Sequence, residues 1–140
     1  MLKNQSIKEI ATKDVVSVHE HQNLSDVAQI IRENMVHHVP VVKGTKVVGI
    51  ISSQDLFKLI FNVDSTDVRM LDTLLDHTYK ITDVMTSKLV ILDESSTIKD
   101  VAKLLSDNSY HSVLVVDNKG DLTGIVTTTD LIRYLHDNIQ

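Results

Sequence analysis

Gly124-Ile125-Val126-Thr127-Thr128-Thr129-Asp130 governs how this chain folds, since the stretch reads as the end of a β-strand followed by the start of a helix. An earlier stretch, Gly49-Ile50-Ile51-Ser52-Ser53-Gln54-Asp55, has the same form, with its glycine and its aspartate each 75 positions before their counterparts. Self-similarity at a fixed spacing is the signature of repeated structural units. The sequence therefore predicts two copies of one unit, each of which closes on this turn.

The elements of the first copy follow from the spacing of its apolar residues and from its turn residues. Residues 15–18 are mostly β-branched and predict a strand, and residues 39–42 and 46–51 predict a hairpin that turns at 43–45. Asn23 is a candidate N-cap for a helix whose apolar residues recur at helical spacing. A short helical turn at 6–10, with a capping box from Ser6 to Glu9, precedes these elements, and a further helix follows Asp55.

The same order recurs in the second half of the chain. We predict a short turn at 81–85, a strand at 89–92, a helix from about residue 98, a hairpin at 113–116 and 122–126, and a final helix. The matching helix stripes lie 74 positions apart, and one extra residue in the second hairpin turn changes the spacing to 75. The predicted core residues on these two helices are Leu24, Val27, Ile31, Ile98, Val101 and Leu105, with Ala28 and Ala102 beside them.

The repeats divide the chain into a first copy at residues 1–62, a linking helix at 63–80 and a second copy at 81–140. Asp64 or Ser65 is a candidate cap for the linking helix, whose Val68, Leu71 and Leu75 should face inward. Because the second copy ends so near Gln140, we expect no separate catalytic domain.

Composition excludes several classes of protein. The 140 residues are 42% hydrophobic but only 4% aromatic, so the core must be aliphatic. The absence of cysteine excludes disulfides, zinc-thiolate sites and thiol nucleophiles. No apolar run approaches the ~18 residues of a membrane span, and no signal peptide is visible. The net charge of −5, without a Lys/Arg cluster, argues against nucleic acid. We therefore expect a cytoplasmic protein that binds neither membrane nor nucleic acid.

The Thr-x-x-Asp motif allows two interpretations. A helix N-terminus presents free N–H groups and a positive dipole end, which suits phosphate. The carboxylate of Asp130 could accept both hydroxyls of a ribose, while the hydroxyls of Thr127 and Thr129 could contact sugar or phosphate. However, the same pattern closely resembles a helix capping box. The motif by itself does not separate ligand binding from capping.

The repeated unit resembles the cystathionine-β-synthase-type (CBS) domain, and two in tandem resemble a Bateman module. The first copy carries His38-Val39-Pro40-Val41 and the turn from Gly49 to Asp55, and the second carries Val84-Met85-Thr86 and the turn from Gly124 to Asp130. This resemblance covers nearly the whole chain. It implies an α+β fold of two pseudo-twofold-related β-α-β-β-α repeats, packed sheet to sheet with the helices outside, and up to two ligand clefts lined by both copies.

The resemblance also implies which residues line each cleft. One cleft would take Thr12, Asp14, Val16, His111, Ser112, Thr127, Thr129 and Asp130. The other would take Thr86, Val90, His37, His38, Ser52 and Asp55. Without the family resemblance, Val16 and Val90 are interpreted as ordinary core residues. His38 and His111 are then interpreted as histidines that are hydrogen-bonded within the fold or exposed to water.

The implied function is a stand-alone regulatory module, not an enzyme, that binds AMP, ADP or ATP and signals to a separate partner, as in energy sensing. The chain departs from the family pattern in two ways: Leu114 stands where the first copy has Pro40, and few cations are available for phosphates. Lys13, Lys88 and Arg133 are the candidates, so AMP, ADP, adenosine or S-adenosylmethionine is favoured over ATP. We expect no cofactor, no metal site, since no carboxylate–His set follows metal spacing, and no catalytic residue.

A second apolar patch on the two final helices predicts a homodimer. Phe57 and Phe61 flank the inward stripe of the first copy, and Ile132 takes the matching place in the second. An apolar patch beyond the core face indicates a partner surface, although a wider core stripe would have the same pattern. Two rival functions stay open: an interaction module without a ligand, and an enzyme that turns over a nucleotide.

Overall fold

The computed structural model describes residues 3–61, 68–107 and 110–140, and the chain divides into two compact units. The central unit is Val16–Lys88. The terminal unit joins the N-terminal segment Met1–Val15 to Leu89–Gln140. Each unit therefore includes a short segment that lies next to the other repeat in the sequence. Residues 1–15 join the second repeat, and the residues from the linking helix up to Lys88 join the first.

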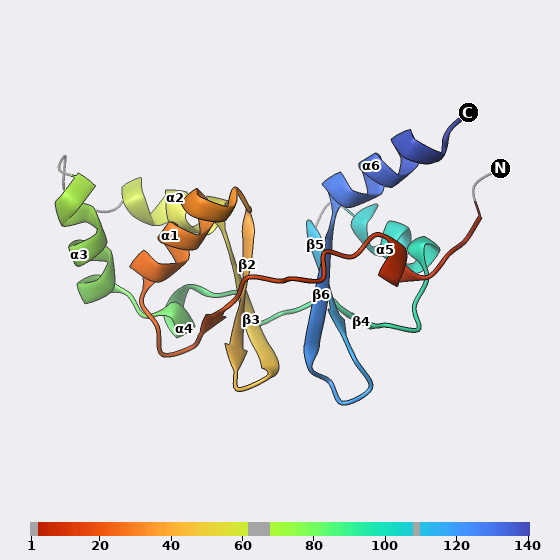
Figure 1. The fold of residues 1–140 in the computed structure, drawn as a ribbon. Coiled ribbons are helices and arrows are strands. Elements are labelled where there is room, and N and C mark those ends of the chain that lie inside the picture. Colours follow the sequence, from red (N-terminus) through yellow and green to blue (C-terminus); the bar gives the residue numbers. More distant parts are fainter. Residues whose placement is uncertain (1–2, 62–67, 108–109) are drawn as a thin grey trace. The chain divides into compact units, whose positions relative to one another are not determined.

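The central unit is a three-stranded sheet with helices on one face (Figure 1). The strand order is β1-β2-β3, with β1 parallel to β2 and β3 antiparallel to it. The β2–β3 hairpin turns at Gly44, which has a φ of 64° that glycine adopts without strain. Its elements are β1 Val18–His19, α1 Leu24–Asn34, β2 His38–Lys43, β3 Lys46–Ser52, α2 Ser53–Phe61, α3 Val68–Thr78 and α4 Ile81–Val84.

The terminal unit repeats this arrangement with the sheet order β4-β5-β6, again with one parallel and one antiparallel pair. The 3₁₀-helix η1 takes the place of α4, and no counterpart of α3 occurs among the described residues. The elements are η1 Ile7–Glu9, β4 Ile91–Asp93, α5 Ile98–Leu105, β5 Ser112–Val116, β6 Leu122–Thr127 and α6 Thr128–Asn138. The predicted α+β class and the β-α-β-β-α order of both repeats are confirmed.

Each unit has its own aliphatic core between sheet and helices. In the central unit, strand residues Val39, Val41 and Ile51 are fully buried against helix residues Leu24 and Val27. In the terminal unit, the buried core is Ile7, Val101, Val113, Val115 and Val126. Burying an aliphatic side chain of this size stabilises the fold by about 1.5–3 kcal/mol.

The structure corrects several sequence-based predictions. The strand predicted at 15–18 is only Val18–His19, because parallel pairing with β2 begins at Val18 and the boundary between the units falls before Val16. The strand predicted at 89–92 is Ile91–Asp93, because its ladder with β5 starts at Ile91. The predicted capping box of the first turn is instead a bond from the Lys8 N–H to the Ser6 hydroxyl.

Burial on the repeated helices also differs from the prediction. Leu24, Val27, Ile98 and Val101 are buried as expected. Ile31 and Leu105 are only half-buried at the edge of their cores, and Ala102 is exposed. In the linking helix, Leu75 is buried and Leu71 is half-buried. Asp64, Ser65 and the side chain of Val68 lie outside the described residues.

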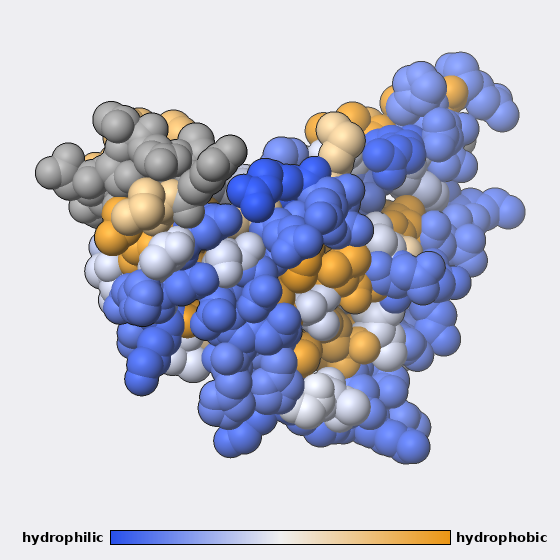
Figure 2. Space-filling view, turned by 60° about the vertical axis from the view of Figure 1, so that its left-hand side comes forward, coloured by the Kyte–Doolittle hydropathy of each residue, from blue (hydrophilic) through white to orange (hydrophobic). Residues whose placement is uncertain are grey.

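The surface is mixed in character. Most of the face in Figure 2 is hydrophilic, and hydrophobic atoms reach it in several places. The large exposed apolar side chains include Phe57 and Phe61 on α2, which are 59% and 74% exposed, and Ile132 on α6, which is 62% exposed. Within the part of the chain that the structure describes, no helix has both the length and the apolar character needed to cross a membrane.

Leu24→Ala should destabilise the protein more than Leu105→Ala. The same atoms are removed in both variants, but Leu24 is fully buried whereas Leu105 lies half-buried at an open edge. The loss at Leu24 should be about 2–5 kcal/mol, with a smaller loss at Leu105. Urea unfolding of the full chain measures both. An equal or larger loss at Leu105 would contradict this assignment of the core.

Candidate functional site

Two isolated antiparallel bridges hold a leading segment against the last strand of each sheet. Thr12 donates its N–H to the Ile125 carbonyl at 2.9 Å and accepts the Ile125 N–H at 3.1 Å. Thr86 and Ile50 exchange the same pair of bonds at 2.9 and 3.0 Å. The strands bridged in this way, β6 and β3, are the ones that lead into the repeated Thr/Ser-x-x-Asp turns.

The glycine of each motif stands where the bridged segment approaches closely. A Cβ atom on Gly124 would lie 3.2 Å from the Thr12 carbonyl oxygen and 3.3 Å from the Ala11 Cβ. A Cβ atom on Gly49 would lie 2.9 Å from the Cβ of Met85 and closer still to its thioether. Both glycines therefore leave room for the segment that the bridge holds.

Asp130 caps its own helix. Its Oδ2 accepts the Thr127 N–H at 2.8 Å and the Thr127 hydroxyl at 3.2 Å, and its Oδ1 lies 3.4 Å from Arg133 Nη1. The side chain of Asp130 is 11% exposed, whereas that of Arg133 is 65% exposed, so the ion pair is screened by water. Since a carboxylate offers four lone pairs, Oδ1 retains acceptor capacity beyond this pair.

The same carboxylate-to-backbone bond recurs along the chain. Asp55 Oδ2 accepts the Ser52 N–H at 2.8 Å, and the Ser52 hydroxyl accepts the Asp55 N–H at 3.1 Å. Asp26 and Asp100 accept the N–H of Asn23 and of Thr97, each at 2.9 Å. The Thr97 backbone N–H, and then its hydroxyl, lowers the pKa of Asp100. Capping is thus a general device of this protein and is not confined to the predicted ligand motifs.

One further carboxylate, outside the predicted sites, has a perturbed pKa. The hydroxyl of Ser95, followed by its backbone N–H, lowers the pKa of Asp93 at the end of β4. Both groups donate to Asp93 Oδ1 and favour its ionised form. Asp93 therefore fixes the turn into α5 and has no part in either predicted set.

The terminal unit brings together most of the set predicted around Asp130. Ser112 begins β5 directly opposite Thr127 at the end of β6, and His111 precedes it on the surface. Thr129 is exposed in the first turn of α6. Thr12 is bridged to β6, and Asp14 follows it as an exposed residue. Val16 belongs to the other compact unit, so its part in this set stays a prediction.

The central unit assembles the corresponding set around Asp55. His38 pairs with Ser52 across the hairpin, and Thr86 is bridged to Ile50. His37 accepts the Ser53 N–H through its carbonyl at 2.8 Å, and its Nδ1 lies 3.4 Å from the Ser53 hydroxyl. Val90 belongs to the terminal unit, where it packs on the core and its carbonyl accepts the Leu114 N–H. Its role beside Asp55 stays a prediction.

Asp130 also lines a surface cavity of about 400 Å³ within the terminal unit, which the sequence did not reveal. Of the predicted set, Asp130 alone is among its lining residues. The others come from the N-terminal segment and from the later turns of α6: Gln5, Glu9, Ile10, Arg133, Tyr134, Asp137 and Asn138. The helical spacing of Asp130, Arg133 and Asp137 is the only sequence signal that could have grouped part of this set.

Among residues 3–61, 68–107 and 110–140, no group of three or more His, Cys, Asp or Glu side chains is placed to hold a metal ion. The rings of His19 and His21 are tilted by 33° with centroids 5.4 Å apart, and His21 Nε2 lies 3.5 Å from Glu20 Oε1.

Comparison with known proteins finds one family. The model of the CBS domain matches residues 7–62 and 81–137. The protein MJ1426 of Methanocaldococcus jannaschii is 34% identical over 92% of this chain and 90% of its own length. The chain spans less than half the length of further relatives that it matches in the same organism.

Solved structures of CBS domain pairs share the fold and contain adenosyl ligands. The structure of CBSX2 in complex with AMP is 25% identical with a TM-score of 0.76, covering 95% of this chain and 97% of its own. The CBS domain pair of MJ0100, in complex with 5′-methylthioadenosine and S-adenosyl-L-methionine, is 25% identical with a TM-score of 0.79. That match covers 98% of this chain and all of the other.

Gly49→Ala should destabilise the central unit, because the added methyl would overlap Met85, whose Cβ is close to the backbone and cannot swing away. Overpacking of this kind costs about 1–3 kcal/mol. Met85→Ala in the Gly49→Ala background removes the overlap with the thioether but keeps the close contact with the Met85 Cβ, so it should recover only part of the loss. Urea unfolding of the two single variants and the double variant measures the coupling. Strictly additive losses would show that the two side chains do not compete for the same space.

Proposed function

The chain belongs to the CBS domain family, and from this premise we propose that it is a regulatory module that binds an adenosyl ligand beside Asp130 and acts on a separate protein. The observation that carries this proposal is the Thr12–Ile125 bridge. It holds the N-terminal segment against the strand that ends at Thr127 and leads to Asp130. Residues from three distant parts of the sequence, including His111 and Ser112, thereby meet in one compact unit.

The chemistry at this place suits a ribose and few phosphates. Asp130 can accept a hydroxyl at Oδ1, while the threonines at the helix start supply hydroxyl donors. Arg133 is the cation paired with Asp130, and its exposed side chain is able to turn toward a phosphate. Relatives of known structure hold AMP or S-adenosylmethionine. We therefore favour AMP, ADP or S-adenosylmethionine over ATP.

The set around Asp55 is the weaker of the two sites in this proposal. Its helix begins Ser53-Gln54, where the terminal unit has Thr128-Thr129. Thr129 is shorter than Gln54, so it leaves more room in front of the carboxylate while keeping a hydrogen-bond donor. A sensing role and cytoplasmic localisation belong to the same proposal, and the absence of cysteine is compatible with a reducing compartment.

Asp130→Asn should weaken ligand binding at least about tenfold, because a hydrogen bond to a charged group contributes about 1.5–3 kcal/mol. Asparagine retains an oxygen that can accept the Thr127 N–H, so the helix cap survives in this variant. Titration calorimetry with AMP, ADP, ATP and S-adenosylmethionine measures the affinities.

Asp100→Asn is the matched control, since Asp100 caps α5 with the same bond but lies outside the predicted set. It should leave ligand affinity unchanged, and Asp55→Asn should have a smaller effect than Asp130→Asn. Equal affinity in wild type and Asp130→Asn would refute the role of Asp130. No binding of any ligand to the wild type would favour the interaction module, and nucleotide turnover would favour an enzyme.

Homodimerisation through the two final helices of the repeats, α2 and α6, is a further part of the proposal, and Ile132 is the exposed apolar residue that α6 adds to the patch. The Phe57 and Phe61 rings pack edge to face on α2, with centroids 4.7 Å apart, although both side chains are largely exposed. Exposed aromatic pairs of this kind are typical of protein interfaces.

Phe57→Glu should convert the dimer to a monomer with the fold retained, because it places a charge in the apolar contact. Lys58→Glu changes the charge of the neighbouring exposed residue and should leave the dimer intact. Sedimentation equilibrium distinguishes the two variants. A wild type that stays monomeric at high micromolar concentration would exclude this dimer.

A further inference from the structure

The polar cavity beside Asp130, with a volume of about 400 Å³, follows one face of α6 in the terminal unit. Asp130 lies in the first turn of this helix, and Asp137 and Asn138 lie in the last. With Arg133 and Tyr134 between them, these residues follow one another at helical spacing and share a face. Because an α-helix rises about 1.5 Å per residue, the cavity extends about 10 Å from Asp130. A ligand whose ribose is held at Asp130 therefore has this space beside it.

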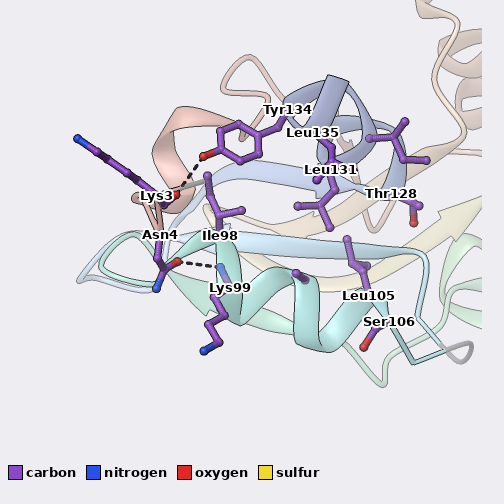
Figure 3. A pocket seen from close by; sticks show the side chains of 12 residues that line it. Lys3, Asn4, Ile98, Lys99, Leu105, Ser106, Thr128, Leu131, Tyr134 and Leu135 are labelled. Atoms are coloured by element: carbon purple, nitrogen blue, oxygen red, sulfur yellow. Dashed lines mark hydrogen bonds between the residues drawn. The ribbon is translucent and has the colours of Figure 1, made fainter. Parts of the chain in front are cut away.

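The opposite wall of the cavity is the N-terminal segment. It contributes Gln5, Glu9 and Ile10. Two hydrogen bonds attach the start of this segment to the helices (Figure 3). The Tyr134 hydroxyl of α6 donates to the Lys3 carbonyl at 3.1 Å, and the Lys99 N–H of α5 donates to Asn4 Oδ1 at 3.1 Å. Ile7, in the middle of the segment, is fully buried. Both walls are therefore in place before a ligand enters, which lowers the cost of binding.

The side chains that line the cavity carry both signs of charge. Among the described residues, its carboxylates are those of Glu9, Asp130 and Asp137, and its cation is Arg133. Arg133 Nη1 lies 3.4 Å from Asp130 Oδ1, and Asp137 Oδ1 lies 3.0 Å from His136 Nδ1. The Glu9 carboxylate makes no hydrogen bond or ion pair with the described residues. A phosphate dianion beside three carboxylates and one guanidinium would meet net repulsion, whereas a group that carries both charges has a partner for each.

The uncharged lining residues suit a short aliphatic chain that ends in polar groups. Ile10 and Tyr134 are half-buried and supply apolar surface. Asn138 Nδ2 donates one N–H to the Tyr134 carbonyl at 2.8 Å and retains a second donor. The side-chain amide of Gln5 has no partner among the described residues. Apolar walls with a few convergent polar groups are typical of small-molecule sites.

We propose that this cavity binds the amino-acid tail of an adenosyl ligand whose ribose is held at Asp130. The ligand is then S-adenosylmethionine or its demethylated form, S-adenosylhomocysteine, and not a nucleotide. The α-ammonium group of the tail pairs with Glu9 and Asp137, and the α-carboxylate pairs with Arg133. The methylene groups lie against Ile10. This inference narrows the ligand class of the proposed function and rests on that function.

Other occupants match the cavity less completely. AMP would place its phosphate among the carboxylates and leave Glu9 without a partner. 5′-Methylthioadenosine has the adenosine and the 5′ sulfur but no group that could pair with Glu9, Asp137 or Arg133. A metal ion lacks ligands, because within the described ranges no three His, Asp or Glu side chains are placed to hold one. The amino-acid tail alone uses both signs of charge.

Titration calorimetry of the full-length protein with four compounds tests the proposal. S-adenosylmethionine and S-adenosylhomocysteine carry the tail, 5′-methylthioadenosine lacks it, and AMP has a phosphate in its place. Both tailed compounds should bind about tenfold or more tightly than 5′-methylthioadenosine, because charge-assisted hydrogen bonds are the strong ones. Both should also bind more tightly than AMP. S-adenosylhomocysteine has no sulfonium charge, so its affinity reports on the tail alone.

Matched variants locate the tail. Asp137→Asn and Glu9→Gln should each lower the affinity for S-adenosylhomocysteine about threefold or more, since each removes a charge at a partly exposed site. Neither should change the affinity for 5′-methylthioadenosine, which also shows that the variant is folded. Arg133→Gln should weaken S-adenosylmethionine but not its decarboxylated form, which has no carboxylate to pair. Glu94→Gln removes a negative charge from the same unit outside the cavity and should leave every affinity unchanged.

Three results would overturn this proposal while leaving the adenosyl site itself standing. The first is that AMP or 5′-methylthioadenosine binds as tightly as S-adenosylhomocysteine. The second is that Asp137→Asn weakens S-adenosylhomocysteine and 5′-methylthioadenosine alike. The third is that Asp130→Asn weakens 5′-methylthioadenosine but not S-adenosylhomocysteine, which would separate the tail from the ribose site. If none of the four compounds binds, the proposed function fails as well.

Discussion

The paired backbone hydrogen bonds that join Thr12 to Ile125 and Thr86 to Ile50 are the constraint on which the rest of the structure depends. Through them, a segment distant in sequence pairs at one point with the last strand of each three-stranded sheet. Closing so long a loop costs entropy that rises only slowly with loop length. In the terminal unit, full burial of Ile7 just before the bridge offsets that cost by about 1.5–3 kcal/mol. The compact units therefore differ from the sequence repeats.

Capping carboxylates explain the helix starts but do not identify a ligand site. Asp26 and Asp100 make the same bond to a backbone N–H as Asp55 and Asp130. The last two differ in their surroundings, because each follows a strand that carries a bridged segment on one side. The strand on its other side is β2, which begins at His38, or β5, which directly follows His111. The proposed binding site therefore arises from this neighbourhood and not from the aspartate itself.

The regular parts of the fold could be predicted because local spacing encodes them. Apolar residues at helical intervals gave α1 and α5, and the paired β-branched runs gave both hairpins. The short parallel strands were misplaced because their ends depend on pairing with β2 and β5, which local sequence does not contain. Ala102 was expected to face inward because it shares a helical stripe with Ile98, Val101 and Leu105, but burial at this position depends on which neighbouring elements cover the helix.

The sequence by itself determined the repeat, the β-α-β-β-α order, the aliphatic cores and the family, since each of these is written in residue type and spacing. Only the tertiary structure decided that the N-terminal segment joins the second repeat, and that Asp130 uses Oδ2 to cap its own helix while Oδ1 faces Arg133. These features depend on contacts between residues far apart in the chain. Such contacts are selected by burial and hydrogen bonding of the whole unit, which no local pattern records.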